Sequence, residues 1–565
     1  MSTSLFRKKS IDKILKDAEE GVDQHHQSGL KRILNVRDLT FMGIAAVVGA
    51  GIFSTIGTAA SNGGPGISLL FVITAVTCGF AALCYAEFAS RVPIAGSAYT
   101  YAYVSFGELI AWIIGWALIL EYAIGNIVVA ISWSSYFNNL LQAMGINLPA
   151  WLTVDPTTAE KAYTATLASS TAGNTLTPDM QSIIDAWNTA PVISGMKIFI
   201  NLPAFIIVCL VAVLTYVGIK ESKKSANAMV IFKIAVIIFV IILGFFYVKP
   251  SYWSPFMPNG IEGVLKGVSA VFYAYIGFDA ISTTAEECKN PQRDLPKGMI
   301  YSLLICTVLY ILIALVLTGM VPFSELNVND PLSFVFERIG KEWISYIVAI
   351  SAVVATTSVL LVFQLGQPRI WMSMSRDGLL PKAFGRVHPK YQTPYFSTIV
   401  SGILVAIPAL FMQASLMTDL TSIGTLFAFV LVSGGVLMLP RITGANDHRS
   451  FKLPYINGKL IVPILFAVFV FFLRDRIGNA AQNLGKDSLQ EVLFLVYVVL
   501  GLILSVATFI KNLSLIPILG VLFCAYLLIE IPAISWLWFF GWMAIGLTIY
   551  FLYGYRKSKL ANSQS

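Results

Sequence analysis

Long apolar stretches, separated by short polar and charged segments, dominate the pattern of the 565-residue chain. Fourteen of them are candidate membrane-spanning helices, because about 20 mostly apolar residues are needed to cross a bilayer. Their centres fall near residues 49, 78, 115, 208, 238, 275, 309, 354, 405, 428, 466, 500, 521 and 544. The third and eighth stretches are long and the eleventh, residues 460–473, is short, so twelve spans also fit. The pattern predicts an all-α polytopic membrane protein with 12–14 transmembrane helices.

Two of these stretches are interrupted by glycine. The first, residues 38–60, contains Gly49 and Gly51, and the sixth, residues 267–286, contains Gly277. Glycine destabilises a helix by about 1 kcal/mol relative to alanine, and unwound backbone in a bilayer persists only where protein or a cavity surrounds it. The glycines could simply allow close helix packing. The matched positions in two halves of the chain favour a transporter's substrate site, as does an acidic residue, Asp279, inside the second stretch.

The two interrupted stretches each open a group of five spans, and the two groups start on opposite sides of the membrane. This arrangement predicts an inverted repeat of five plus five helices. The predicted segments are an N-terminal cytoplasmic part (1–37), a first repeat (38–248) with an outer loop at about 145–195, an inverted repeat (249–440), additional C-terminal helices (441–555) and a cytoplasmic tail (556–565). The outer loop is interpreted as an insertion and the C-terminal helices as a peripheral scaffold or dimerisation layer.

Composition and charge agree with a membrane protein. The chain is 57% hydrophobic and 12% charged, with a mean hydropathy of +0.76, which excludes the soluble globular classes. With both termini in the cytoplasm, 28 of the 38 lysines and arginines lie inside, 9 lie outside and one, Lys233, lies within a span. This ratio satisfies the positive-inside rule. The net charge of +8 therefore reflects topology, and no nucleic-acid partner is expected.

Catalytic and metal chemistry find little support in the sequence. The six cysteines show no metal-binding spacing, and the four histidines all fall in predicted cytoplasmic segments. We therefore expect neither an enzyme nor a metal or organic cofactor. A proton carrier within the membrane has to be a carboxylate or a lysine.

A broken helix offers the groups that recognise an α-amino acid. The N–H groups of Gly49, Ala50 and Gly51 can hold a carboxylate at the positive end of a half-helix. Backbone carbonyls near Ala45 and Ala46, and along 272–274, can accept hydrogen bonds from an ammonium group. One pocket with both features binds an amino acid without any charged side chain.

Three charged residues are predicted to lie inside the membrane. Lys233 is central in its span, where a lysine costs about 2.5–3.5 kcal/mol, so it is expected to face the interior. It is either a strut that bridges helix carbonyls or a proton-coupling group, and the two roles are compatible. Glu121 either pairs with a polar group on a neighbouring helix or faces a cationic substrate side chain. Asp279 is either a hydrogen-bonding anchor or a protonation site.

Several stretches together resemble the amino acid–polyamine–organocation superfamily, and most closely the bacterial members of its cationic amino acid transporter branch. They are residues 47–53, 87–101, 107–125, 272–291 and 366–381, the last reading GQPRIWMSMSRDGLLP. The resemblance covers nearly the whole chain from about residue 30. It implies a LeuT-type core of two inverted five-helix repeats, with broken helices 1 and 6, that works by alternating access.

The resemblance also implies roles for particular residues. Gly49, Ala50 and Gly51 match the carboxylate-binding break, and Phe272 or Tyr273 matches the aromatic gate over the substrate. Lys233 resembles the lysine that, in proton-coupled relatives, stands where sodium-coupled relatives bind sodium between helices 1 and 8. The predicted substrate-binding set is Ala45, Ala46, Gly49, Ala50, Gly51, Glu121, Phe272, Tyr273, Ala274, Ile276, Asp279 and Ala355, and the predicted proton-coupling set is Lys233, Thr356 and Thr357.

The expected function is proton-coupled import of L-amino acids, cationic or small and neutral, across a plasma membrane, which is here expected to be a bacterial inner membrane. A sodium-independent exchanger is the alternative. Protons are the expected coupling ion and sodium is not expected to take part. Besides the substrate and the lipid bilayer, a small accessory membrane subunit or a second copy of the chain is a candidate partner.

Overall fold

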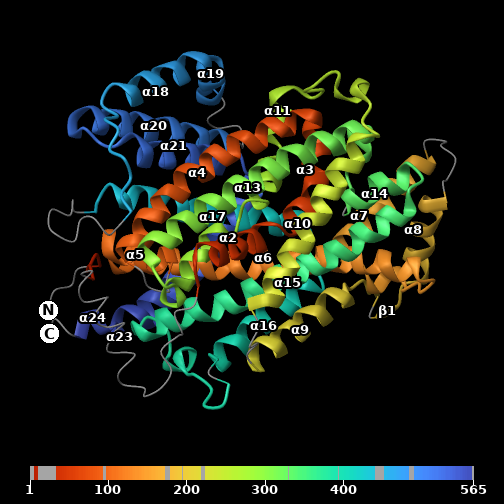
Figure 1. The fold of residues 1–565 in the computed structure, drawn as a ribbon, viewed down its shortest axis with the longest axis horizontal. Helices are drawn as coiled ribbons and strands as arrows, with labels where there is room; N and C mark the ends of the chain where they lie inside the picture. The colour runs from red at the N-terminus through yellow and green to blue at the C-terminus, as the bar shows by residue number, and fades with distance from the viewer. Residues whose placement is uncertain are drawn as a thin grey trace.

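A computed structural model describes residues 5–9, 34–92, 97–171, 178–193, 195–217, 223–328, 330–391, 393–439, 451–482 and 489–562. Helices make up nearly all of its regular structure (Figure 1). The one sheet of the described residues is an antiparallel pair, β1 (Val192–Ile193) and β2 (Met196–Lys197). The prediction of an all-α protein is confirmed apart from this small hairpin.

The helices have the lengths and composition of membrane spans. Within the described residues, nine helical segments are long and apolar enough to cross a bilayer, and four shorter helices are also apolar. Twelve of the fourteen predicted centres fall inside a helix, and the other two, residues 49 and 275, fall at the breaks of the two interrupted helices. The predicted long third and eighth spans are helices of 36 and 35 residues. The predicted short eleventh span has 12 residues, which is about 18 Å of helix and less than a typical hydrocarbon core.

The first group of helices begins with a broken helix. Its elements are α2 (Val36–Val47), η1 (Gly51–Thr55), α3 (Ile56–Gly63), η2 (Gly64–Gly66), α4 (Ile67–Arg91), α5 (Ser97–Ser105), α6 (Glu108–Ala143), α9 (Leu202–Val217) and α10 (Lys223–Phe245). The side chain of Asn35 caps α2 by accepting from the N–H of Arg37 and of Asp38, and Asp38 accepts from the N–H of Asn35 in return. This capping box fixes the start of α2.

The second group begins with the other broken helix. Its elements are η4 (Pro250–Trp253), α11 (Gly260–Leu265), α12 (Val268–Tyr273), η5 (Phe278–Glu287), α13 (Pro291–Met320), η6 (Phe323–Glu325), α14 (Pro331–Arg338), α15 (Glu342–Arg376), η7 (Lys382–Gly385), α16 (Tyr395–Ala409) and α17 (Ala414–Val436). Between α12 and η5, Gly277 has a φ of +118°, a left-handed conformation that favours glycine. The long helices α6 and α15 pack against each other beside both breaks.

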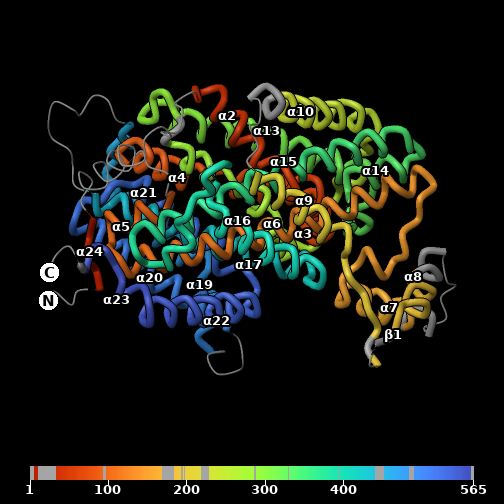
Figure 2. Tube along the Cα trace, turned by 90° about the horizontal axis from the view of Figure 1, so that it is seen from below, coloured from red at the N-terminus to blue at the C-terminus, as the bar shows by residue number. Residues whose placement is uncertain are grey.

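Between α6 and α9 the chain forms a separate small unit, which we call the insertion. It contains η3 (Ala150–Leu152), α7 (Pro156–Thr171), α8 (Pro178–Thr189) and the β1–β2 hairpin. Ala159, Ala190 and Phe199 form its small core, and Trp187 stacks on Phe199 with ring centroids 5.4 Å apart. The insertion lies at the end of the molecule opposite to the two chain termini (Figures 1 and 2). We call its end the insertion face and the other end the terminal face.

The last helices divide into two parts. They are α18 (Ile461–Phe472), α19 (Arg474–Gln482), α20 (Leu489–Lys511), α21 (Leu515–Ile529), α22 (Ala533–Ile549), η9 (Tyr550–Gly554), α23 (Tyr555–Lys557) and α24 (Lys559–Asn562). Helix α21 packs against α17 and α4, and α22 packs against α17 and α6. Helix α20 presents Leu502, Ile503 and Ile510 on its exposed side. The interpretation of all these helices as a peripheral layer therefore fits α18 and α20 better than α21 and α22.

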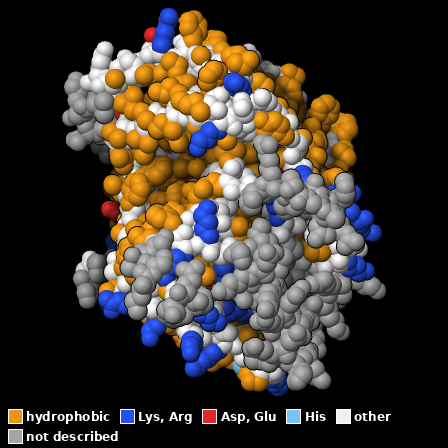
Figure 3. Space-filling view, turned by 90° about the vertical axis from the view of Figure 1, so that its left-hand side faces the viewer, with side chains coloured by type: hydrophobic (Ala, Val, Ile, Leu, Met, Phe, Trp, Pro, Cys, Tyr) orange, Lys and Arg blue, Asp and Glu red, His pale blue; other side chains and the backbone are white. Residues whose placement is uncertain are grey.

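At the terminal face, the start of α6 contacts described segments from both the N-terminal and the C-terminal parts of the chain. The carboxylate of Glu108, at the start of α6, accepts hydrogen bonds from the hydroxyls of Tyr550 (3.1 Å) and Ser558 (2.5 Å). The guanidinium of Arg7 lies 3.6 Å from the same carboxylate. Figure 3 shows this end of the molecule, where lysine and arginine side chains are plainly more frequent than acidic ones.

Candidate substrate site at the two helix breaks

A small cavity lies where the two broken helices meet. Its volume is about 10 Å³, which is roughly the space of one water molecule. Its lining residues are Ala46, Val47, Gly49, Ala50, Gly51, Val129, Tyr273, Ile276, Val359 and Phe363. The structure therefore shows a closed form of this site, and an amino acid can enter only after the surrounding helices move apart.

The first break occupies two residues. Helix α2 ends at Val47, and Val48 has extended backbone angles (φ −79°, ψ 93°). The carbonyl of Gly49 then accepts from the N–H groups of Ile52 and Phe53, both at 3.2 Å, at the start of the next half-helix. The first N–H groups of a half-helix have no partner within it. Here they come from the segment that lines the cavity, and their binding of a carboxylate stays a prediction.

Both glycines of the first break lie in close packing contacts. A Cβ atom on Gly51 would lie 2.3 Å from the Cα of Ala274, and one on Gly49 would lie 2.6 Å from a methyl group of Val359. The backbones of the two broken helices therefore touch at Gly51. Both interpretations of the glycine pair agree with the geometry.

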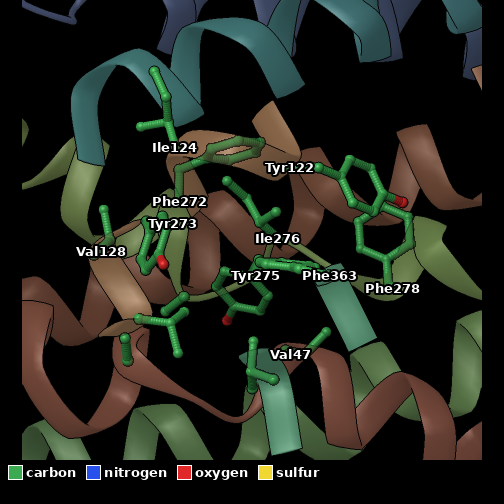
Figure 4. Close-up of a cluster of buried hydrophobic side chains, with 14 of the residues drawn as sticks. Val47, Tyr122, Ile124, Val128, Phe272, Tyr273, Tyr275, Ile276, Phe278 and Phe363 are labelled. Carbon is green, nitrogen blue, oxygen red and sulfur yellow. The ribbon is translucent and has the colours of Figure 1, made fainter. Parts of the chain in front are cut away.

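Two aromatic residues at the second break have different surroundings. Tyr273 lines the cavity, and its hydroxyl donates a hydrogen bond to the carbonyl of Gly125 at 3.1 Å. Phe272 is fully buried, and its ring packs edge-on against Phe429 with centroids 5.9 Å apart. Figure 4 shows these side chains within the aromatic cluster around the site. Of the two predicted gate residues, Tyr273 is the one at the cavity.

Lys233 joins the first break to α15. Its ammonium is fully buried and donates to the carbonyls of Ala45 (2.9 Å) and Val48 (2.8 Å) and to the hydroxyl of Ser358 (3.2 Å). The bridge predicted between helix 1, which contains the first break, and helix 8, which is α15, is therefore present. Its α15 partner, Ser358, was not among the predicted residues.

The two threonines of α15 that were predicted beside Lys233 make hydrogen bonds with other groups. The hydroxyl of Thr356 donates to the carbonyl of Ala352 at 2.6 Å, and the hydroxyl of Thr357 accepts from the indole N–H of Trp133 at 2.9 Å. The carbonyl of Ala355 accepts from Ser358 at 2.7 Å. Thr356 and Ala355 are buried in the helix packing and do not line the cavity.

The two acids predicted at the site, Glu121 and Asp279, lie outside the cavity lining. Glu121 faces α17, where its Cβ lies 3.7 Å from the place that a Cβ on Gly424 would take. The Asp279 carboxylate is near enough to act on Glu121 electrostatically. Within the described residues, Oε2 of Glu121 and Oδ1 of Asp279 have no hydrogen-bond partner. Glu121 therefore lies outside the lining of this closed form of the site, and its contact with a substrate side chain stays a prediction.

Four lining residues were missed by the sequence reasoning. They are Val47, Val129, Val359 and Phe363, all apolar and all within long apolar helices. A valine that lines a cavity has the same sequence signature as a valine in a helix contact, so no local signal distinguishes these four. Of the predicted substrate residues, Ala46, Gly49, Ala50, Gly51, Tyr273 and Ile276 line the cavity, while Ala45 and Ala274 lie directly behind it.

The fold and this site define a class: a polytopic helical membrane protein with a small cavity between two broken helices, lined by glycines and mostly apolar side chains. The comparisons with known proteins agree. The family model described as amino acid permease matches residues 34–503, and a second model, for the C-terminus of these permeases, matches residues 513–558. The chain belongs to the amino acid permease family, within the superfamily that its motifs resemble.

Individual relatives carry different substrate names. The branched-chain amino acid permease BcaP of Bacillus subtilis is 39% identical over 561 residues, covering 99% of this chain and 100% of its own. The methylthioribose transporter of the same bacterium is 37% identical with the same coverage. The vacuolar cationic amino acid transporter 4 of Arabidopsis thaliana is 37% identical over 447 residues, covering 77% of this chain and 67% of its own. All three are named as transporters or permeases, and none as an enzyme.

Proposed function

We propose that this chain imports L-amino acids with apolar side chains, coupled to protons, by alternating access between the two sides of a bacterial plasma membrane. The observation that carries the proposal is the ammonium of Lys233, held between the break in helix 1 and Ser358 of α15. A fixed positive charge at this contact performs the electrostatic work of a bound sodium ion. It leaves sodium no role, so protons remain as the coupling ion.

The preference for apolar side chains rests on the cavity lining. Val129, Ile276, Val359 and Phe363 supply carbon surface, and no acidic side chain is among the lining residues of the described cavity. A cationic substrate side chain would lose its hydration there without gaining a partner, which is costly. The name of the Bacillus subtilis branched-chain permease points to the same substrate class.

The orientation belongs to the same proposal. With the terminal face in the cytoplasm, the basic side chains of that face obey the positive-inside rule (Figure 3). The insertion and α14 then lie outside. The two groups of five helices act as the two repeats whose relative motion exposes the cavity to each side in turn.

Uptake by purified protein in liposomes tests the proposal. With no amino acid inside, an inward proton gradient should drive accumulation of leucine or valine, and an inward sodium gradient should not. Arginine and methylthioribose serve as competitors that represent the other named substrate classes. Uptake that needs an internal amino acid and ignores the proton gradient would instead identify an exchanger.

A further inference from the structure

Helix α14 covers the broken helix 1 at the insertion face. It packs against η1 and along the start of α15, where the hydroxyl of Ser333 donates to the carbonyl of Ser345 at 3.3 Å. The segment leading into α14 lies on α3, because a Cβ on Gly57 would lie 2.4 Å from the carbonyl oxygen of Leu326 and 3.1 Å from the Cβ of Pro331. Helix α14 therefore lies against the half-helix that follows the first break, on the side of the insertion face.

One polar contact connects the start of α14 to α6. The side-chain amide of Asn139, near the end of α6, donates a hydrogen bond to the carboxylate of Asp330, the residue that precedes α14. The backbone carbonyl of Asp330 accepts from the N–H groups of Ser333 and Phe334, both at 3.1 Å. One turn before Asn139, the hydroxyl of Tyr136 donates to the carbonyl of Phe53 in η1. Helix α6 thus makes hydrogen bonds both to the start of α14 and to η1 of the broken helix.

We propose that Asp330 and Asn139 form a proton-operated clasp, which closes α14 over the cavity when Asp330 binds a proton from the insertion face. This inference rests on the proposed function for its physiological direction, since it places the insertion face outside. The clasp provides a protonation site separate from Lys233. It makes closure of the outer path respond to the proton concentration on that side.

The burial of Asp330 determines whether protonation favours the closed or the open arrangement. Desolvation in the closed arrangement raises the pKa of Asp330 from 3.8 to about 6, although the hydrogen bond from Asn139 opposes the shift. The titratable groups that act on this carboxyl in the described part are Glu337, from α14 itself, and Tyr136, from α6. Opening admits water and restores the ordinary pKa. Protonation therefore favours closure, fully below about pH 4, and the advantage is lost as the pH rises through about 6.

The expected effect is measurable without transport. Between pH 7 and pH 5, this pKa difference shifts the closed-to-open ratio by about tenfold towards the closed form. A cysteine in place of Ser54, a half-buried residue of η1, reports access from the insertion face by its rate of reaction with a hydrophilic maleimide. A cysteine in place of the exposed Gln142 gives the reference rate. The reaction rate of each cysteine rises with its thiolate fraction, and this fraction changes with pH in the same way at both positions. The ratio of the two rates therefore reports only how accessible position 54 is.

The experiment uses the full chain in lipid nanodiscs, with no substrate and no gradient. The Ser54-to-Gln142 ratio should fall about tenfold from pH 7 to pH 5. With Asp330→Asn, which is neutral at every pH, the ratio should be low and flat. With Glu337→Gln, on the exposed side of α14, the fall should persist. A flat ratio in the parent protein, or an undiminished fall with Asp330→Asn, overturns the clasp.

A second variant covers the case in which Asp330→Asn does not fold. Asn139→Ala removes the hydrogen bond that favours the carboxylate, so the midpoint of the fall should move to higher pH. An unchanged midpoint contradicts the clasp. Because no uptake is measured, a protein that proves to be an exchanger can still show the clasp. Conversely, proton-driven uptake with a pH-independent ratio would sink the clasp alone.

Discussion

The ammonium of Lys233 lies 2.8 Å from the carbonyl oxygen of Val48, the residue at which helix 1 leaves its helical path. A carbonyl at the end of a helix has no partner within that helix. Lys233 supplies the missing donor from α10 and reaches α15 through Ser358 at the same time. The lysine therefore stabilises the break itself, and the strut and coupling roles predicted for it involve the same contacts.

Substitutions at Lys233 should separate these two roles. Lys233→Met leaves the carbonyls of Ala45 and Val48 without this donor, and each unpaired buried group costs about 1–3 kcal/mol, so both thermal stability and transport should fall. Lys233→Arg keeps a positive charge at every pH, so substrate binding should remain while proton-driven accumulation is lost. Ligand-induced thermal shifts and uptake into liposomes measure the two effects. Full pH-driven accumulation by Lys233→Arg would refute a coupling role.

The preference of the site for large or small substrate side chains should depend on Ile276. This residue lines the cavity from the second break, beside Phe363 in the cluster of Figure 4. Ile276→Ala removes three carbon atoms, so leucine binding should weaken by about tenfold or more, while alanine binding should change little. Competition binding with the two amino acids gives the ratio. Leu502→Ala, on the exposed side of α20, is the matched control and should leave both affinities unchanged.

The features predicted well from the sequence are those with a local cause. The span positions follow from runs of apolar residues. The breaks follow from Gly49, Gly51 and Gly277, where close neighbours leave no room for a side chain. Lys233 was identifiable because a charge inside an apolar run needs partners. These signals are carried by the residues themselves and do not depend on the rest of the fold.

Other features depend on packing between distant segments. Ser358 differs from Thr356 and Thr357 only in its direction on α15, which decides which hydroxyl meets Lys233. Whether Glu121 lines the cavity is likewise decided by the rotation of α6 about its axis. A shift of one residue turns a helix by about 100°, and motif positions alone do not fix that angle.

Glu121 should therefore affect transport without setting selectivity. It faces Gly424 of α17 and does not line the cavity. Glu121→Gln should lower the transport of leucine and of arginine by the same factor, because neither side chain would touch it. Competition uptake with both amino acids measures the ratio of the two losses. A loss confined to arginine would return Glu121 to the substrate pocket and would contradict the apolar selectivity proposed for the site.

The tryptophan contact between α6 and α22 makes α22 part of the structural core. Trp116 and Trp542 each donate an indole N–H to the backbone carbonyl of the other, at 2.9 and 3.1 Å, and their rings stack with centroids 4.7 Å apart. The indole of Trp112 donates to the carbonyl of Gly546 at 2.9 Å. A Cβ on Gly546 would lie 2.3 Å from the Trp116 ring, so any side chain there must push the helices apart.

Gly546→Leu should consequently destabilise the protein by about 1–3 kcal/mol, the usual penalty of overpacking, and lower its melting temperature in detergent. Transport should decrease as well, because α6 carries Val129 of the cavity and the Asn139 side of the clasp. Gly541, on the same helix, has open space where a Cβ would lie, so Gly541→Leu controls for the general effect of replacing a glycine. Equal melting temperatures for the two variants would show that α22 is a detachable layer, and the contact with α6 would then have no part in holding the site.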